Sequence, residues 1–175
     1  MTTTITPCLW FDNNLEEAAE FYSSVFPNSS VGEFYRYTDA GPGTPGDVAY
    51  GTFDLDGNRF LGINGGPLFK FNEAVSFEVR CADQAEVDYY WSKLTDGGEE
   101  SQCGWLKDRY GLSWQIVPER LYELLDDAEP ARAAAATAAM MEMQKIVVAD
   151  LEAAVENVCP GQLSASVAQD IHHVS

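Results

Sequence analysis

The feature that most constrains this fold is a plan that occurs twice along the chain, at an offset of 70 residues. Asn13 and Glu16 have the spacing of a helix capping box, and Asp83 and Glu86 repeat it. In each half an apolar run precedes the pair, helical periodicity follows it, and strand patterns come next. Capping boxes are common, but the shared order of elements indicates an internal duplication. The chain is therefore predicted to contain two similar modules, each running strand, helix and then strands.

In the first half, the helix starting at Asn13 is expected to stop at Pro27. We predict strands over residues 5–11 and 31–37 and a hairpin of 48–55 and 58–64 across the Asp56-Gly57 turn. Residues 39–47 hold three Gly and two Pro, which predicts a mobile loop over a site.

In the second half, a strand is expected over residues 74–81 and a helix from Asp83 through Leu94. Residues 101–118 then predict a strand, a tight turn at 108–111 and a buried strand that ends at Pro118. The two strands carry two Trp, a Lys and a Gln where a cupped sheet can meet a small molecule.

The C-terminal third has a different composition. After an acidic break at 126–130, residues 131–158 predict a long Ala-rich helix, with an interruption left open. Its apolar stripe comprises Met140, Met143, Val147, Leu151, Val155 and Val158. This stripe is expected to cover its own domain or a dimer mate, and a Met-rich ligand groove is the alternative. Residues 160–175 are expected to be disordered.

The balance of charge excludes several classes of partner. Ten Lys and Arg stand against 28 Asp and Glu, a formal net charge of −18, which repels nucleic acid and anionic membrane surfaces. The four Cys form no C-x-x-C pair and both His lie at the C-terminal end, which argues against a zinc site or a disulfide scaffold. With no evident signal peptide or membrane span, a cytoplasmic protein is expected.

Several motifs together resemble one family. They are Phe11-Asp12-Asn13-Asn14, Phe21-Tyr22, Asn64-Gly65-Gly66-Pro67, Gly104-Trp105-Leu106-Lys107-Asp108 and Trp114-Gln115-Ile116-Val117-Pro118. The chain resembles the PhnB-like branch of the vicinal oxygen chelate (glyoxalase/bleomycin resistance/dioxygenase) superfamily, a branch often labelled 3-demethylubiquinone-9 3-methyltransferase-like. The resemblance covers about residues 3–125, and the segment 145–154 also looks like the family's C-terminal helix.

The resemblance implies an α+β fold in which two βαβββ modules, 3–67 and 72–125, form curled sheets around a cleft. A C-terminal helical arm over 130–159 would extend it. The resemblance also implies a homodimer. Metal-dependent members place His or Glu at four strand positions, which map near Thr6, Phe60, Ser76 and Gln115, within one or two residues. These residues are poor ligands for a divalent ion, so neither a metal nor another cofactor is expected.

Strand alternation selects candidate ligand-binding residues. Trp10 shares a face with Thr6 and Cys8, and either lines the cleft or packs in the core or against a dimer mate. Ser76, Glu78 and Arg80 share a face too. Glu78 and Arg80 form either an internal ion pair or a ligand anchor, and Glu78 is a general base if burial raises its pKa.

Gln115 can orient a carbonyl or phosphonate ligand, or bond a neighbouring strand or water. Trp105 and Lys107 alternate on their strand, and Trp114 is expected to point away from Gln115, so that one indole lines the cavity and another packs the helices. Tyr50 and Asn64 are further candidates for the cleft wall.

Three functions compete. The first is a metal-free protein that binds a small aromatic or polar organic molecule, as bleomycin-resistance proteins do. The second is an enzyme of the superfamily, an isomerase, a dioxygenase or the labelled methyltransferase, with Glu78 as general base; no G-x-G-x-G segment follows a strand and opens a helix to support methyl transfer. The third is a structural or regulatory dimer whose cleft is closed by side chains.

Overall fold

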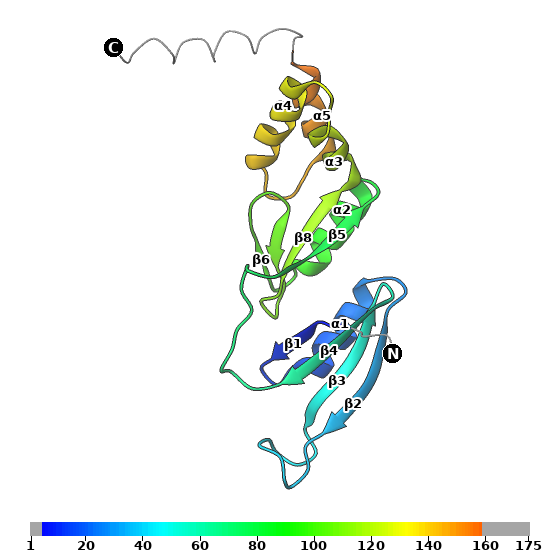
Figure 1. Ribbon diagram of the computed structural model, residues 1–175, viewed down its shortest axis with the longest axis vertical. Coiled ribbons are helices and arrows are strands. Elements are labelled where there is room, and N and C mark those ends of the chain that lie inside the picture. The colour runs from blue at the N-terminus through cyan, green and yellow to red at the C-terminus, as the bar shows by residue number, and fades with distance from the viewer. Residues whose placement is uncertain (1–4, 159–175) are drawn as a thin grey trace, which may run out of the picture. The chain divides into compact units, whose positions relative to one another are not determined.

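The computed structural model describes residues 5–158, and Figure 1 shows their helices and strands. These residues divide into two compact units. The first holds the chain up to Val75 together with residues 110–112, and the second holds residues 76–109 and the chain from Ser113 onward. Each unit contains one four-stranded sheet among the described residues.

The first unit contains β1 (Cys8–Phe11), α1 (Leu15–Val25), β2 (Ser30–Arg36), β3 (Val48–Leu55) and β4 (Asn58–Asn64). Its sheet has the order β1-β4-β3-β2, with β1 parallel to β4 and the other pairs antiparallel. One face packs against α1, which buries its apolar stripe there because Leu15, Ala18 and Tyr22 recur at helical spacing. The predicted hairpin is confirmed residue for residue. The first strand starts later than predicted, since Pro7 has no amide to donate and Ile5 is 93% exposed.

The start of α1 differs from the predicted capping box. Asn13 has a φ of 61°, and the N-cap is Asn14, whose side chain makes no capping hydrogen bond. The amide of Leu15 instead donates to Oδ1 of Asn64, 3.0 Å away and 49 residues later in the chain. The prediction of a capping box at Asn13 and Glu16 was therefore wrong, because a strand residue supplies the acceptor.

The second unit repeats the plan with β5 (Ser76–Cys81), α2 (Gln84–Leu94), β6 (Glu99–Glu100), β7 (Trp105–Lys107) and β8 (Ser113–Pro118). Its order, β5-β8-β7-β6, matches that of the first sheet strand for strand, so the predicted duplication is confirmed. Here the N-cap bond of the predicted capping box forms, since Oδ1 of Asp83 accepts from the Glu86 amide. The Glu86 carboxylate accepts in return from the amide of Ala82, one residue before the N-cap.

Three helices follow in the second unit, α3 (Glu119–Leu125), α4 (Pro130–Met141) and α5 (Val148–Glu156). The interruption that was left open for the helix over 131–158 is present, between α4 and α5, whereas α3 was missed. They enclose a core of Val117, Leu121, Leu124, Ala136, Ile146, Leu151 and Val155, with Met140 and Met143 packed at its margin. The predicted apolar stripe thus covers its own unit. The tail predicted over 160–175 lies outside the described residues.

None of the helices in the described part of the chain is both long and apolar enough to span a membrane.

Candidate functional site

Each sheet has a second face that does not pack against its module helix, α1 or α2, and we call it the helix-free face. In the second sheet, Tyr122 of α3 contacts Glu78 at the edge of this face. In the first sheet, the strand register places Trp10 beside Ile63, Ile63 beside Tyr50, and Tyr50 beside Tyr35. This aromatic row takes one residue from each strand. Leu9 and Phe11, which alternate with Trp10, are buried on the other face, as predicted.

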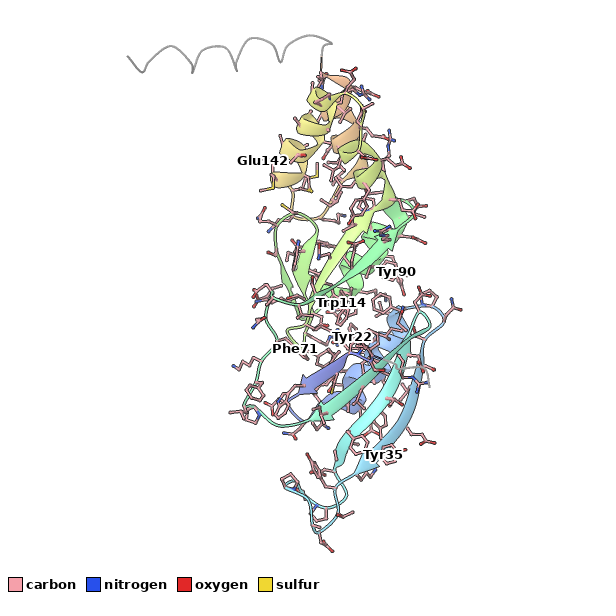
Figure 2. All side chains as sticks on the ribbon, viewed as in Figure 1. Tyr22, Tyr35, Phe71, Tyr90, Trp114 and Glu142 are labelled. Atoms are coloured by element: carbon pink, nitrogen blue, oxygen red, sulfur yellow. The ribbon has the colours of Figure 1, made fainter. Side chains whose placement is uncertain are left out.

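The two tyrosines of the aromatic row are exposed to solvent. Their rings stack with centroids 4.7 Å apart and an interplanar angle of 14°, and 46% of Tyr35 and 42% of Tyr50 remain accessible. Figure 2 labels Tyr35 on β2. Tyr35 was not among the predicted ligand-binding residues, although its place three strands from Trp10 follows from the register.

Trp10 is held in place by the Asn64-Gly65-Gly66-Pro67 segment. Its indole Nε1 donates to the carbonyl of Gly66 at 2.8 Å, and its ring lies edge-on to Phe69 with centroids 4.9 Å apart. A Cβ atom on Gly65 would overlap the indole, so this position requires glycine. The motif therefore fixes the orientation of one aromatic side chain on the helix-free face.

Two residues assigned to the cleft lie elsewhere. Asn64 is 6% exposed, and its amide is used inside the unit: Oδ1 caps α1 and Nδ2 donates to the Val48 carbonyl at 3.0 Å. Phe60, near a mapped metal position, is buried and stacks on Phe53 with centroids 5.3 Å apart. On β4, the residues that lie on the helix-free face are instead Leu61 and those two positions away from it. The mapped metal position on this strand was therefore off by one residue.

The loop over residues 39–47 is tied to Tyr37. The backbone amide of Tyr37 donates to the carbonyl of Asp47 at 2.8 Å, and the Tyr37 carbonyl accepts from the amide of Gly46 at 2.9 Å. The Tyr37 hydroxyl also donates to the carbonyl of Asn64 at 2.8 Å. Gly41 and Gly43 leave room for the ring, since a Cβ atom on either would touch it. The loop thus has fixed attachments, while its predicted mobility stays a prediction.

In the second sheet the helix-free face carries two polar rows. One contains Glu78, Gln115 and Trp105, and the other contains Ser76, Ser113 and Lys107. Gln115 joins the rows, because its Nε2 donates to Oγ of Ser76 at 2.9 Å. A bond to a neighbouring strand was one of the alternatives that the sequence left open for Gln115.

Trp114 points the other way, as predicted. It is buried, and its indole Nε1 donates to Oδ2 of Asp108 at 2.8 Å. Figure 2 labels Trp114 within the second unit. Trp105, half-buried, is therefore the indole of this sheet that lies on the helix-free face.

Glu78 forms an internal ion pair with Arg80, which was one of the two roles that the sequence allowed for this pair. Its Oε1 accepts from Nε of Arg80 at 2.8 Å, and its Oε2 accepts from the Tyr122 hydroxyl at 2.7 Å. The Arg80 guanidinium also lies over the Tyr122 ring, 4.9 Å from its centroid. Arg80 first and Tyr122 second lower the pKa of Glu78, outweighing its desolvation. The condition under which Glu78 would be a general base, a pKa raised by burial, is therefore not met.

The residues at the mapped metal positions do not fit a divalent ion. Within residues 5–158, no group of three or more His, Cys, Asp and Glu side chains is arranged to hold a metal. The polar donors near those positions are the hydroxyl of Ser76 and the amide of Gln115, already hydrogen-bonded to each other, and Glu78 is paired with Arg80. Neutral oxygens of this kind are weak ligands compared with imidazole or carboxylate.

Ser113 is a candidate that the sequence reasoning missed. It is 1% exposed, and its hydroxyl is one of three buried side-chain groups without a hydrogen-bond partner in the described structure. The signal was available in part, because Ser113 lies two residues before Gln115 on the same strand and so shares its face. Its burial could not be anticipated from that pattern.

Two βαβββ modules whose sheets have the same strand order, each with one face not covered by its module helix, define the class of glyoxalase and bleomycin-resistance folds. A family model described as 3-demethylubiquinone-9 3-methyltransferase matches residues 3–117. The chain belongs to this family, the PhnB-like branch of the vicinal oxygen chelate superfamily. A comparison with curated proteins gave no match.

Solved structures agree with this assignment. A PhnB protein from Bacillus cereus, described as a 3-demethylubiquinone-9 3-methyltransferase, is 35% identical, with 66% of this chain and 99% of that chain covered and a TM-score of 0.61. The protein PA1353 from Pseudomonas aeruginosa is 17% identical over 67% and 98% of the two chains, with a TM-score of 0.54. The fosfomycin resistance protein FosX from Listeria monocytogenes is 14% identical over 73% and 99%, with a TM-score of 0.53. The last two show similarity of fold alone.

Proposed function

We propose that this protein binds a small organic molecule with a planar apolar part, and that it does so without a resident metal ion. The observation that carries the proposal is the aromatic row of Trp10, Ile63, Tyr50 and Tyr35 on the helix-free face of the first sheet. Stacked aromatic side chains left in contact with water favour a partner that covers them.

The donor chemistry supports binding without a metal. The side chains near the mapped ligand positions are hydroxyls and an amide, and the carboxylate beside them is neutralised by Arg80. Hydrogen-bonding groups of this kind orient an organic ligand, whereas a catalytic divalent ion requires stronger ligands.

An enzyme that uses Glu78 as its base is less well supported. Hydrogen bonds from Arg80 and Tyr122 stabilise the ionised carboxylate and lower its pKa, which makes it a weaker acceptor of a proton. The methyl transfer named in the family description has no residue in this chain to which we can assign it. The homodimer remains a prediction from the resemblance, because Leu151 and Val155 of the apolar stripe invoked for it are buried in the core of their own unit.

The proposal is tested by screening planar aromatic fragments by NMR on the ¹⁵N-labelled protein. Fragments that bind should shift the amide signals of β2 and β3. Tyr50→Ala should lower the affinity of these fragments about two- to tenfold, which is the effect of losing one aromatic contact. Tyr89→Ala is the matched control, since Tyr89 is 40% exposed but lies on α2. If no fragment binds, or if both variants weaken binding equally, the proposal is wrong.

A further inference from the structure

Two sulfur atoms from distant parts of the chain lie in contact in the second unit. The thiol of Cys103 donates to the thioether of Met141, with Sγ and Sδ 3.7 Å apart and the two residues 38 positions apart in the chain. Cys103 lies in the turn before β7, and Met141 is the last residue of α4; Figure 2 labels Glu142, which follows it. Met141 is 57% exposed and Cys103 is partly exposed, so the pair is open to solvent.

The backbone holds the two side chains in this arrangement. The amide of Cys103 donates to the carbonyl of Met143, and the amide of Gly104 donates to the carbonyl of Gln144, both at 2.7 Å. Cys103 has a φ of 58°, which is uncommon for a residue with a side chain and sets the direction of its Cα–Cβ bond. These bonds join the turn to the segment after α4, and therefore keep the thiol beside the end of that helix.

The two other cysteines of the described residues are in different surroundings. Cys81 is fully buried, its thiol donates to the carbonyl of Val79, and burial raises its pKa to about 12. A thiol of this kind stays protonated and inert near neutral pH. Cys8 is exposed but lies in the first unit, whereas the three methionines of the described residues belong to the second. Cys103 alone combines access to solvent with a thioether in contact.

A thiolate and a thioether are soft ligands, and soft ligands of this kind select Cu(I) over magnesium, calcium and manganese. Two metal–sulfur bonds of about 2.3 Å span the 3.7 Å between Sγ and Sδ when the metal lies off the line that joins them. This geometry leaves a further position at the metal open to water or a small ligand. One thiolate balances the charge of a monovalent cation, whereas a structural zinc ion takes four ligands drawn from Cys, His and carboxylates.

We propose that Cys103 and Met141 form a binding site for a soft monovalent cation of the class of Cu(I) and Ag(I). On binding, the Cys103 thiol releases its proton to solvent, and the metal takes the place of that proton between the two sulfurs. The negative charge of the chain favours the approach of any cation, so the selectivity comes from the sulfurs. The site is independent of the proposed function, because neither residue belongs to the aromatic row.

The first test observes the thioether directly. The full chain carries Cys8→Ser and Cys159→Ser, so that Cys103 and the buried Cys81 are its remaining thiols, and its methionine methyl groups are labelled with ¹³C. Ag(I), which is diamagnetic, should shift the methyl signal of Met141, assigned through Met141→Leu. The signals of the other methionines should move little, and Zn(II) should leave the Met141 signal in place.

The second test measures affinity for Cu(I) without oxygen, in competition with the colorimetric chelator bathocuproine disulfonate. In the same background, Met141→Leu should lower the affinity at least about tenfold, since changes even outside the ligands of a metal have effects of this size. Leucine keeps the volume of the side chain, so the fold should be retained. The matched control is the chain with Cys103→Ser and Cys159→Ser, whose exposed Cys8 thiol should bind Cu(I) no more tightly than the Met141→Leu protein does.

Three outcomes overturn the inference. A Met141 methyl signal that stays in place while Ag(I) binds shows that the thioether is not a ligand. Equal Cu(I) affinity with methionine and leucine at position 141 shows that Cys103 acts as an ordinary free thiol. A shift of the Met141 signal by Zn(II) as large as that by Ag(I) contradicts a soft site. The binding of aromatic fragments at Tyr35 and Tyr50 is tested separately and does not depend on these results.

Discussion

At the scale of single residues, the environment of Glu78 decides its chemistry more than its position does. A carboxylate on a sheet face is a possible base or ligand anchor, but the Arg80 guanidinium and the Tyr122 hydroxyl each bind one of its oxygens. The same contact raises the pKa of Tyr122, because the neighbouring carboxylate disfavours a phenolate. The cluster therefore stabilises Glu78 as an anion and joins α3 to the edge of the sheet.

This cluster makes a pH-dependent contribution to stability. Because the pKa of Glu78 in the folded protein lies below its ordinary value of 4.5, the contribution is fully present above that value and is lost as pH falls through the folded pKa. Tyr122→Phe should lower the free energy of unfolding at pH 7 by about 0.5–1 kcal/mol, since the pair is partly exposed. Urea unfolding at pH 7 and at pH 3.5 should show the deficit shrinking at the lower pH.

The control for this prediction is Tyr35→Phe. It removes a hydroxyl that also donates to a carboxylate, that of Glu33 at 3.0 Å, but on the solvent-exposed strand β2. We expect no measurable loss of stability from it. A deficit of Tyr122→Phe that is constant with pH would contradict the role of the Glu78 charge.

At the scale of secondary structure, the N-terminus of α1 depends on a strand far away in sequence. Asn64 caps the helix and at the same time binds the carbonyl of Val48, so one buried amide joins α1, β3 and β4. Gly65, which follows it, leaves the space occupied by the indole of Trp10. The segment after β4 thus positions both a helix and a side chain of the candidate site.

The prediction at this scale compares two asparagines. Asn64→Ala removes the hydrogen bonds that Asn64 makes to the Leu15 amide and the Val48 carbonyl and should cost about 2 kcal/mol of unfolding free energy. Asn13→Gly should change stability by less than about 0.5 kcal/mol, because φ of 61° suits glycine and no capping bond is lost. Chemical denaturation of both variants checks this. A larger loss of unfolding free energy from Asn13→Gly than from Asn64→Ala would support the capping box predicted from sequence.

At the scale of the whole molecule, the excess of acidic residues is the dominant electrostatic property. The formal charge of −18 repels itself in the compact state, whereas the ion pairs of the structure are mostly exposed and individually weak. Self-repulsion is long-ranged and is screened by salt, with a Debye length of about 10 Å at 0.1 M. The repulsion among the acidic side chains should therefore outweigh the stabilisation that the ion pairs provide.

The resulting prediction concerns salt. Raising KCl from about 0.05 to 0.5 M at pH 7 should increase Tm by a few degrees, because the Debye length falls well below the spacing of most charges. Differential scanning fluorimetry measures this, with NaCl in parallel to separate screening from a specific effect of potassium. A Tm that falls with both salts would show that ion pairs, and not repulsion, dominate the electrostatics.

Local periodicity explains why much of the fold was predictable. The hairpin of β3 and β4, both module helices and the opposite orientation of Gln115 and Trp114 depend on patterns of two or 3.6 residues, which are readable within a short window. The position of the break between α4 and α5 was not, because residues 142–147 leave the helix where Ile146 enters a core built by α3 and β8. The short helix α3 lacked the flanking signals that the module helices have.

The amino-acid sequence by itself determined the duplicated plan, the residues that share each strand face and the family, since all three depend on order and spacing along the chain. Only the tertiary structure decided which polar groups are already occupied. Asn64 is used by α1, Glu78 by Arg80 and Tyr122, and Ser113 by no described residue. The physical reason is that hydrogen bonding and burial depend on neighbours brought together by folding, and Tyr122 reaches Glu78 across 44 residues of chain.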